Sequence, residues 1–198
     1  MIICGIDASI NGSSCTKFML DQNNKIIKSK FLAFTTVKKD AKLHKNGIIF
    51  HYKKIQFKNA LDKYIWMEEK IINFCENVDL IAIENYAFSG NNLAMIGEFT
   101  GGIKRKLYDN NIPFTLFPIG TIKKYFTGKG NSKKDAMIAS YIKRKDIYKI
   151  EFSDEILAKT KSFINDVVDS YAIASLLYNN FLENDNLLED FIYNSKGI

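Results

Sequence analysis

Four acidic side chains are the residues of this 198-residue chain best suited to chemistry. Asp7 ends the first apolar run of the sequence, and Glu84 ends a later one. Asp166 and Asp169 lie three residues apart in a segment of helical pattern, so both should project from one face of that helix. Carboxylate oxygens are the ligands that Mg²⁺ prefers, and Mg²⁺ leaves its other positions to water and to phosphate oxygens. The four residues therefore predict a metal site for phosphate chemistry.

Two ions held about 3.5–4 Å apart by such a cluster can activate a water and stabilise the leaving oxygen of a phosphodiester. We therefore expect two Mg²⁺ ions per site, with Mn²⁺ as a substitute. Asn165 directly precedes Asp166 and suits a helix N-cap, so we expect the helix to begin close to it. The positive end of the helix dipole would then help to keep Asp166 and Asp169 ionised.

The elements that must position these acids indicate one α/β domain over residues 1–198. Short connections between the first three strands predict antiparallel neighbours. The sheet should be mixed and five-stranded, flanked by helices, with a basic insertion or extended hairpin at 36–57 and a peripheral acidic tail from about 184. The predicted strands are residues 2–7, 15–20, 25–35, 79–84 and 112–117, and the predicted helices are residues 58–76, 93–110, 133–145 and 163–182.

Positive charge is concentrated in two segments of a chain whose formal net charge is +6. Residues 21–58 hold ten lysines against two aspartates, and residues 120–150 hold eight lysines and one arginine against two aspartates. Such segments are typical of a protein that binds a phosphate backbone, because each neutralised phosphate releases condensed counterions. A solvated, lysine-rich surface is the alternative interpretation.

The order of the predicted elements resembles the ribonuclease-H-like fold, in which the first and fourth strands lie side by side and a C-terminal helix packs across the sheet. Within that fold, four motifs resemble the RuvC-like Holliday-junction resolvases, including those of bacteriophages and large DNA viruses. The motifs are Gly5-Ile6-Asp7, Ile83-Glu84-Asn85, the basic glycine-containing stretch from Ile122 to Lys134, and the helical segment from Asp166 to Ala174.

The resemblance implies a metal-dependent, structure-specific DNA endonuclease. Such an enzyme resolves four-way junctions, and in viral members other branched DNA, by paired nicks made by a homodimer. The four acids would be the metal ligands and, together with Lys134, the catalytic residues. The DNA contacts would come from Lys123, Lys124, Lys129, Lys133, Tyr86 and Phe88, although core packing is an equally good explanation of the two aromatic residues.

Three other functions remain open at the level of sequence. A nucleotide-binding domain of the actin type also begins with a Gly-Ile-Asp strand, but such proteins need two domains. A non-catalytic DNA-binding scaffold and a nuclease of the same fold that acts on RNA-containing substrates are the other two. A Walker-type phosphate loop is excluded, because the stretch around Gly128 lacks the required Gly-Lys-Ser/Thr sequence.

The cysteines and the apolar pattern indicate the compartment. Cys4, Cys15 and Cys75 are odd in number and have no metal-ligand spacing, so we expect buried thiols in a reducing cytoplasm. The first apolar run is too short for a signal peptide and has no basic flank before it. No stretch approaches the roughly 20 apolar residues of a membrane span.

Overall fold

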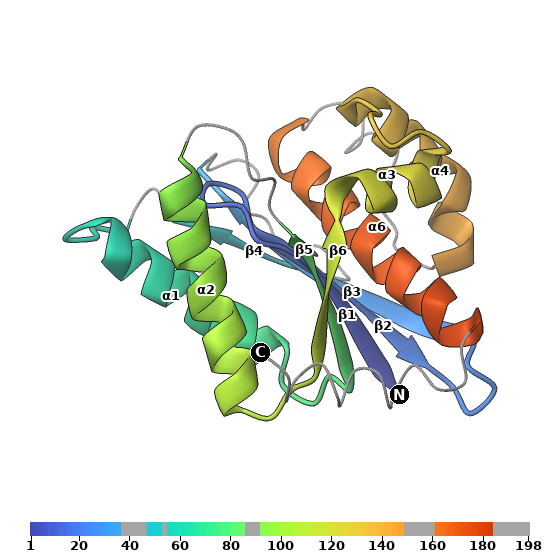
Figure 1. Ribbon diagram of the computed structural model, residues 1–198, viewed down its shortest axis with the longest axis horizontal. Helices are drawn as coiled ribbons and strands as arrows, with labels where there is room; N and C mark the ends of the chain where they lie inside the picture. Colours follow the sequence, from blue (N-terminus) through green and yellow to red (C-terminus); the bar gives the residue numbers. More distant parts are fainter. Residues whose placement is uncertain (37–46, 53–54, 86–91, 149–160, 184–198) are drawn as a thin grey trace.

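Six strands form one mixed sheet in the computed structural model, which describes residues 1–36, 47–52, 55–85, 92–148 and 161–183. The strand order is β4-β3-β2-β1-β5-β6 (Figure 1). The pairs β1–β2 and β2–β3 are antiparallel, as predicted, whereas β1–β5, β5–β6 and β3–β4 are parallel. The strands are β1 (Ile2–Asp7), β2 (Ser14–Leu20), β3 (Ile26–Thr35), β4 (Gly47–His51), β5 (Leu80–Asn85) and β6 (Phe114–Pro118).

Helices cover both faces of the sheet (Figure 1). One face carries α1 (Ala60–Phe74) and α2 (Leu93–Asp109). The other carries α3 (Ile119–Thr127), α4 (Lys134–Tyr148) and α6 (Lys161–Glu183). None of these described helices is both long and apolar enough to cross a membrane.

The long helix α6 is the centre of one of the two cores. Its residues Val167, Val168 and Ala172 are fully buried against the sheet. The ring of Tyr171 makes edge contacts with several aromatic rings, including that of Phe18 on β2, at a centroid distance of 5.5 Å. Because α6 is apolar on so much of its surface, burial rather than helix propensity fixes its place across β1 and β2.

Small residues allow this close packing. Gly5 on β1 faces α6, and a Cβ at this position would collide with the backbone of Ser170 and Ala174. On the other face, Cys4, Cys15 and Cys75 are free, buried thiols, as the sequence predicted. The strand β1 therefore contacts α6 through a glycine on one face and contributes a small thiol to the core on the other.

The structure departs from the predicted elements in two places. The sheet has six strands rather than five, because residues 47–51 form β4, which pairs parallel with β3. An extended hairpin at this point is therefore wrong, although residues 37–46 and 53–54 lie outside the described part of the chain. A short helix, α3, follows β6 directly where the sequence predicted neither a helix nor a strand. The acidic tail from 184 also lies outside the described residues.

Candidate active site

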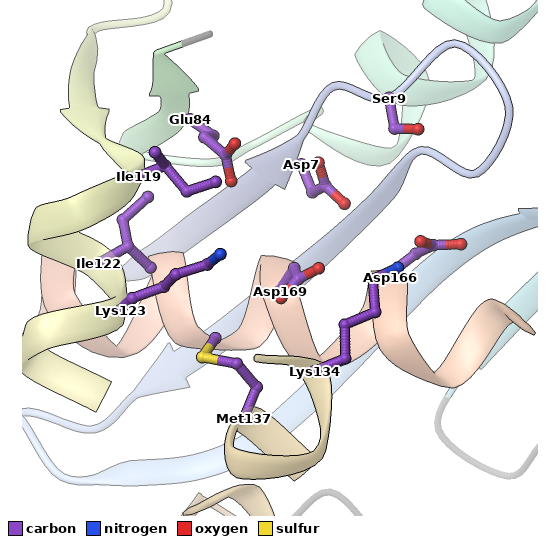
Figure 2. Close-up of a pocket in the computed structure, with 10 residues that line it drawn as sticks. All are labelled: Asp7, Ser9, Glu84, Ile119, Ile122, Lys123, Lys134, Met137, Asp166 and Asp169. Carbon is purple, nitrogen blue, oxygen red and sulfur yellow. The ribbon is translucent and has the colours of Figure 1, made fainter. Parts of the chain in front are cut away.

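Two neighbouring strands end at the centre of the candidate site. Asp7 is the last residue of β1, and Glu84 is the penultimate residue of β5. The two strands are parallel and pair up to Ile6 and Ile83, so the two acids follow directly at the same edge of the sheet. Strand side chains alternate between faces, which directs both carboxylates to the face that α6 covers. Figure 2 shows both side chains above α6.

The other two acids come from α6, whose position is fixed by hydroxyl groups of β2. Ser14 donates a hydrogen bond to the backbone carbonyl of Asp166. The hydroxyls of Thr16 and Ser170 are 2.8 Å apart, and both side chains are fully buried. These contacts lie within one turn of Asp166 and Asp169. These hydrogen bonds therefore fix the positions of Asp166 and Asp169 relative to the end of β1.

A cavity of about 220 Å³ unites the four acids with two lysines. Lys123 comes from α3 and Lys134 is the first residue of α4, so the cations approach from the side opposite the strands (Figure 2). The remaining lining residues are Ser9, Ile119, Ile122 and Met137. The cavity thus combines carboxylates, ammonium groups and an apolar wall.

The loop between α3 and α4 is held by its own hydroxyl groups, which fixes the two lysines relative to each other. The hydroxyls of Thr127 and Ser132 lie 2.6 Å apart, and Ser132 also donates to the carbonyl of Lys129 at 2.8 Å. Gly128 ends α3 with a left-handed backbone, at φ +85°, which a glycine adopts without strain. The sequence singled out this glycine-containing stretch, and the structure makes it a hydrogen-bonded turn between the two helices that carry the lysines.

Burial and mutual repulsion make the four carboxyls reluctant to ionise together. Burial, followed by the charges of Glu84, Asp169 and Asp166, raises the pKa of Asp7 well above its usual range. The pKa of Glu84 rises to about 7, mainly through burial and then through Asp169, although Lys123 opposes the shift. This is the electrostatic pattern of a cluster whose negative charge exceeds the positive charge beside it.

The pKa values of the two acids of α6 are also raised, although lysines oppose the shift. Burial raises the pKa of Asp166 to about 7 and that of Asp169 to about 6. Lys134 lowers the pKa of both groups, and Lys123 also lowers that of Asp169. The two ammonium groups therefore offset only part of the cost of burying these carboxylates, and a divalent cation would offset more of it.

The chemistry of this donor set fits a hard divalent cation, because every candidate ligand is a carboxylate oxygen. Among the described residues, however, no three His, Cys, Asp or Glu side chains are arranged to hold one ion as they stand. The carboxylate of Asp166 lies against Gly12 in the turn after β1. Mg²⁺ commonly takes only one or two protein carboxylates, with water and phosphate as its other ligands. Asp7 with one neighbouring acid would supply that number.

Some sequence expectations about the site need correction or fall outside the described residues. Asn165 is not a helix cap, because α6 spans Lys161–Glu183 and Asn165 lies inside it. The dipole argument for Asp166 and Asp169 is weakened accordingly, since the effect falls off within the first turn. Tyr86 and Phe88 lie in segment 86–91, outside the described residues.

The three remaining predicted DNA contacts do not line the cavity. The lysines concerned, Lys124, Lys129 and Lys133, are exposed residues of α3 and of the loop that follows it. Sequence reasoning missed Ser9, which lines the cavity, and Gly12, which makes room for Asp166. Ser9 follows Asp7 by two residues in a Ser- and Gly-rich turn, and this proximity was the signal available in the sequence.

Comparisons with known proteins bear on the fold. No family model matches the sequence, and no curated protein matches it by sequence. Among solved structures, the chain is similar to RuvC of Thermus thermophilus, with a TM-score of 0.60 and 14% identity over 92% of this chain and 97% of that one. It is also similar to the Holliday junction resolvase of fowlpox virus, with a TM-score of 0.53 and 18% identity over 91% and 99% of the two chains.

Both proteins have also been solved with their substrate. The complex of T. thermophilus RuvC with a Holliday junction substrate matches with a TM-score of 0.58, at 16% identity. The complex of the fowlpox virus resolvase with substrate Holliday junction DNA matches with a TM-score of 0.56, at 19% identity. Each comparison covers 92% of this chain and at least 94% of the other. The chain therefore has the RuvC-like form of the ribonuclease-H-like fold.

Proposed function

We propose that this chain is a metal-dependent, structure-specific DNA endonuclease that resolves Holliday junctions by paired nicks. The observation on which the proposal depends is the cavity at the ends of β1 and β5. Four carboxylates from three elements and two lysines line one space of about 220 Å³. The similarity in fold to two proteins that were solved with Holliday junctions supports the choice of substrate.

In this proposal, two Mg²⁺ ions, or Mn²⁺ in their place, bind at Asp7, Glu84, Asp166 and Asp169. When bound, such ions lower the pKa of a water nucleophile and neutralise charge on the phosphate under attack. The carboxylates supply the negative charge that would hold the ions. The apolar wall of Ile119 and Ile122 limits the access of other water to the scissile phosphate. The all-carboxylate donor set is therefore the feature of the site that suits such an ion.

The lysines act on the phosphate. Lys134 and Lys123 line the cavity on the side opposite the strands, where an ammonium group can bind a non-bridging phosphate oxygen as negative charge develops on it. Exposed lysines of the neighbouring loop, such as Lys129 and Lys133, would bind the backbone on either side of the cut. Recognition would then depend on the shape and charge of the branch rather than on base sequence.

A homodimer and a cytoplasmic location complete the proposal. A four-way junction is close to twofold symmetric, so a twofold dimer would place one cavity on each of two strands and give paired nicks. The free, buried state of Cys4, Cys15 and Cys75 supports a reducing compartment.

The proposal is tested by offering the purified chain a labelled four-way junction beside a flap, a linear duplex and an RNA–DNA hybrid of related sequence. Each substrate is incubated with Mg²⁺, with Mn²⁺ or with EDTA. We expect metal-dependent, symmetrically placed nicks in the junction and little cutting of the linear duplex. Junction binding without cutting under all conditions would instead indicate a non-catalytic scaffold. Cutting confined to the hybrid would indicate a nuclease of the same fold that acts on RNA-containing substrates.

A further inference from the structure

A second cavity lies on the opposite face of the sheet from the candidate active site. It has a volume of about 370 Å³ and lies between α1 and the strands β2, β3 and β4. Its floor is apolar and includes Leu32, Ile48 and Phe50, and Ile48 is 44% exposed. We refer to this cavity as the α1 groove. None of its lining residues belongs to the catalytic cavity.

Three lysines surround the α1 groove, and they repel one another. Lys17 and Lys30 are directly opposite each other on β2 and β3, an arrangement of like charges that destabilises a sheet. Lys70 approaches from α1. Among the described residues, no acidic side chain forms an ion pair with any of the three, and Lys17 donates only to the backbone carbonyl of Glu76, at 3.3 Å. The groove therefore fits an occupant that is both anionic and apolar.

The aromatic rings of the groove argue against a stacked nucleic-acid base as that occupant. The ammonium group of Lys17 lies 4.6 Å from the ring centroid of Phe74. Phe50 stacks on Phe34 at 5.7 Å, and Lys70 lies 5.7 Å from its centroid. Stacking of bases needs a free aromatic face, and here the lysines already lie over these rings. Carboxylate and aliphatic side chains suit the groove better than a base does.

The chain itself contains a segment of this composition. The fifteen residues after Glu183 interleave acids with apolar residues, in an order that places Asp185 before Leu187 and Leu188, and Glu189 and Asp190 before Phe191 and Ile192. The segment holds one lysine, Lys196, against three acids. The negative charge and the apolar side chains of this segment therefore complement the lysines and the apolar floor of the α1 groove.

The end of α6 is close enough for this segment to reach the groove. The hydroxyl of Tyr178, in the last turns of α6, donates to the carbonyl of Asn24 at 2.8 Å, in the turn that joins β2 to β3. The groove residues Met19 and Lys30 belong to the same two strands. In Figure 1, α6 ends beside this hairpin. The segment must pass around the end of the sheet to the opposite face, and packed layers are only about 10 Å apart. Fifteen extended residues span up to about 50 Å, so the segment is long enough for this path.

We propose that residues 184–198 dock in the α1 groove of their own chain. Their acids pair with Lys17, Lys30 and Lys70, and their apolar side chains cover the floor around Ile48. This docking relieves the repulsion between the opposed lysines and buries the exposed apolar surface. It is independent of the catalytic cavity and of the proposed nuclease activity.

Trp66 provides the test, because it is the only tryptophan of the chain and its ring lies 5.7 Å from that of Phe50 in the groove. In the full-length protein, Ser195→Cys is labelled with a thiol-reactive dansyl acceptor, and energy transfer from Trp66 is measured. The native cysteines are fully buried and should not react in the folded protein. We expect efficient transfer that decreases as salt is added, since the contact is largely electrostatic.

The decisive variant is Lys30→Glu with Lys70→Glu, and Arg105→Glu on the exposed side of α2 is the matched control. The groove variant should lose most of the transfer, whereas the control should keep it. Lys30→Glu places a carboxylate opposite Lys17, so the sheet should tolerate the change, and circular dichroism of each variant checks its fold. Unlabelled versions of every variant correct for any direct effect of position 70 on Trp66 fluorescence.

Two outcomes would overturn the proposal. One is transfer that is equally strong in the groove variant and in the control, because the tail would then be held elsewhere. The other is weak transfer in the parent protein together with binding of a single-stranded oligonucleotide that Lys30→Glu and Lys70→Glu abolish. That second result would make the α1 groove a nucleic-acid surface.

Discussion

Asp7 is the residue at which the repulsion within the candidate active site is concentrated. Its pKa is raised by burial and by each of the other three acids. The site therefore stores electrostatic repulsion in the absence of a cation, a common cost of functional sites. Ionisation of these carboxyls should therefore lower the free energy of unfolding of the metal-free protein.

The metal-free protein should lose stability as the pH rises from about 4 to about 7. The folded pKa values of Glu84, Asp166 and Asp169 are about 7, 7 and 6, above the usual 4.5 for Glu and 3.8 for Asp. In this range the folded state holds protons that the unfolded state has released, so folding is favoured at the acid end and disfavoured at the alkaline end. Thermal unfolding in EDTA across this range measures the effect.

Two changes should reverse this loss. Asp7→Asn removes a charge from the cluster and should raise the melting temperature in EDTA at pH 8, whereas Asp109→Asn on the exposed end of α2 should leave it almost unchanged. Mg²⁺ should stabilise the parent protein most at pH 8, because it binds the ionised carboxylates of the folded state. A melting temperature that does not change with pH, with Asp7→Asn or with Mg²⁺ would contradict this picture of the site.

Lys134 and Lys124 should differ in their effect on cleavage. Lys134 lines the cavity, so Lys134→Ala should slow the cleavage of bound junction by about 100-fold, as expected for the loss of a group that stabilises transition-state charge. Lys124 is exposed and outside the cavity, so Lys124→Ala should weaken junction binding and its salt dependence with little change in single-turnover rate. Similar rates for the two variants at saturating protein would show that Lys134 contributes only to binding.

At the scale of elements, the contact between β1 and α6 determines whether the acids meet. Gly5 lies against the backbone of α6 at Ser170, which directly follows Asp169, and at Ala174, just over one turn further along. The hydroxyl pair of Thr16 and Ser170 fixes the same region from β2. Any change that widens this contact should move Asp169 away from Asp7, which lies two residues beyond Gly5.

Gly5→Ala should therefore be costly in both stability and activity. The added methyl must displace backbone atoms, so we expect a loss of about 1–3 kcal/mol in the free energy of unfolding. Gly101→Ala in α2 is the matched control, because no atom lies within 4 Å of the added methyl. An alanine inside a helix should stabilise the protein by about 0.5–1 kcal/mol. Urea denaturation of both variants tests the pair, and equal effects would mean that α6 does not depend on Gly5.

Much of this arrangement could be predicted from the sequence. The apolar runs ending at Asp7 and Glu84 have the length and composition of buried strands, so the ends of both strands followed from the pattern, whereas their neighbouring positions followed from the resemblance to the ribonuclease-H-like fold. The helical spacing of Asp166 and Asp169 correctly placed both on α6. The comparisons confirm the predicted fold class, apart from the number of strands.

The features that the sequence did not reveal depend on tertiary contacts. The strand β4 has only five residues, lies in a lysine-rich region and is stabilised by pairing with β3 rather than by its own pattern. The helix α3 follows β6 without a loop, because Pro118 is both the last residue of the strand and the N-cap of the helix. The contact of Gly12 with Asp166 joins residues more than 150 positions apart, and no local pattern encodes it.

At the scale of the whole molecule, the sheet separates two surfaces with different proposed roles. The face with α3, α4 and α6 holds the catalytic cavity, and the face with α1 holds the α1 groove. The positive charge on the first face would bind the arms of the junction. Residues 184–198 would neutralise the positive charge of the α1 groove on the second face. The proposed dimer must leave two catalytic cavities accessible to one junction.

The dimer itself should be measurable in the absence of DNA. We expect sedimentation equilibrium to give a mass close to twice the 22.7 kDa of the chain at micromolar concentration. One junction should then bind two chains, and mixing an Asp7→Asn chain with the parent should give single nicks rather than paired ones. A monomer at all concentrations, with and without junction DNA, would contradict the paired-nick proposal while leaving the cavity unaffected.

The most direct test of the central claim is single-turnover cleavage of a four-way junction in Mg²⁺ by three proteins: the parent chain, Asp7→Asn and Asp109→Asn. We expect paired nicks by the parent and by Asp109→Asn. For Asp7→Asn we expect a rate lower by at least about 100-fold, with junction binding retained, since several kcal/mol of transition-state stabilisation would be lost. Undiminished cutting by Asp7→Asn would show that the carboxylate cavity is not the catalytic centre.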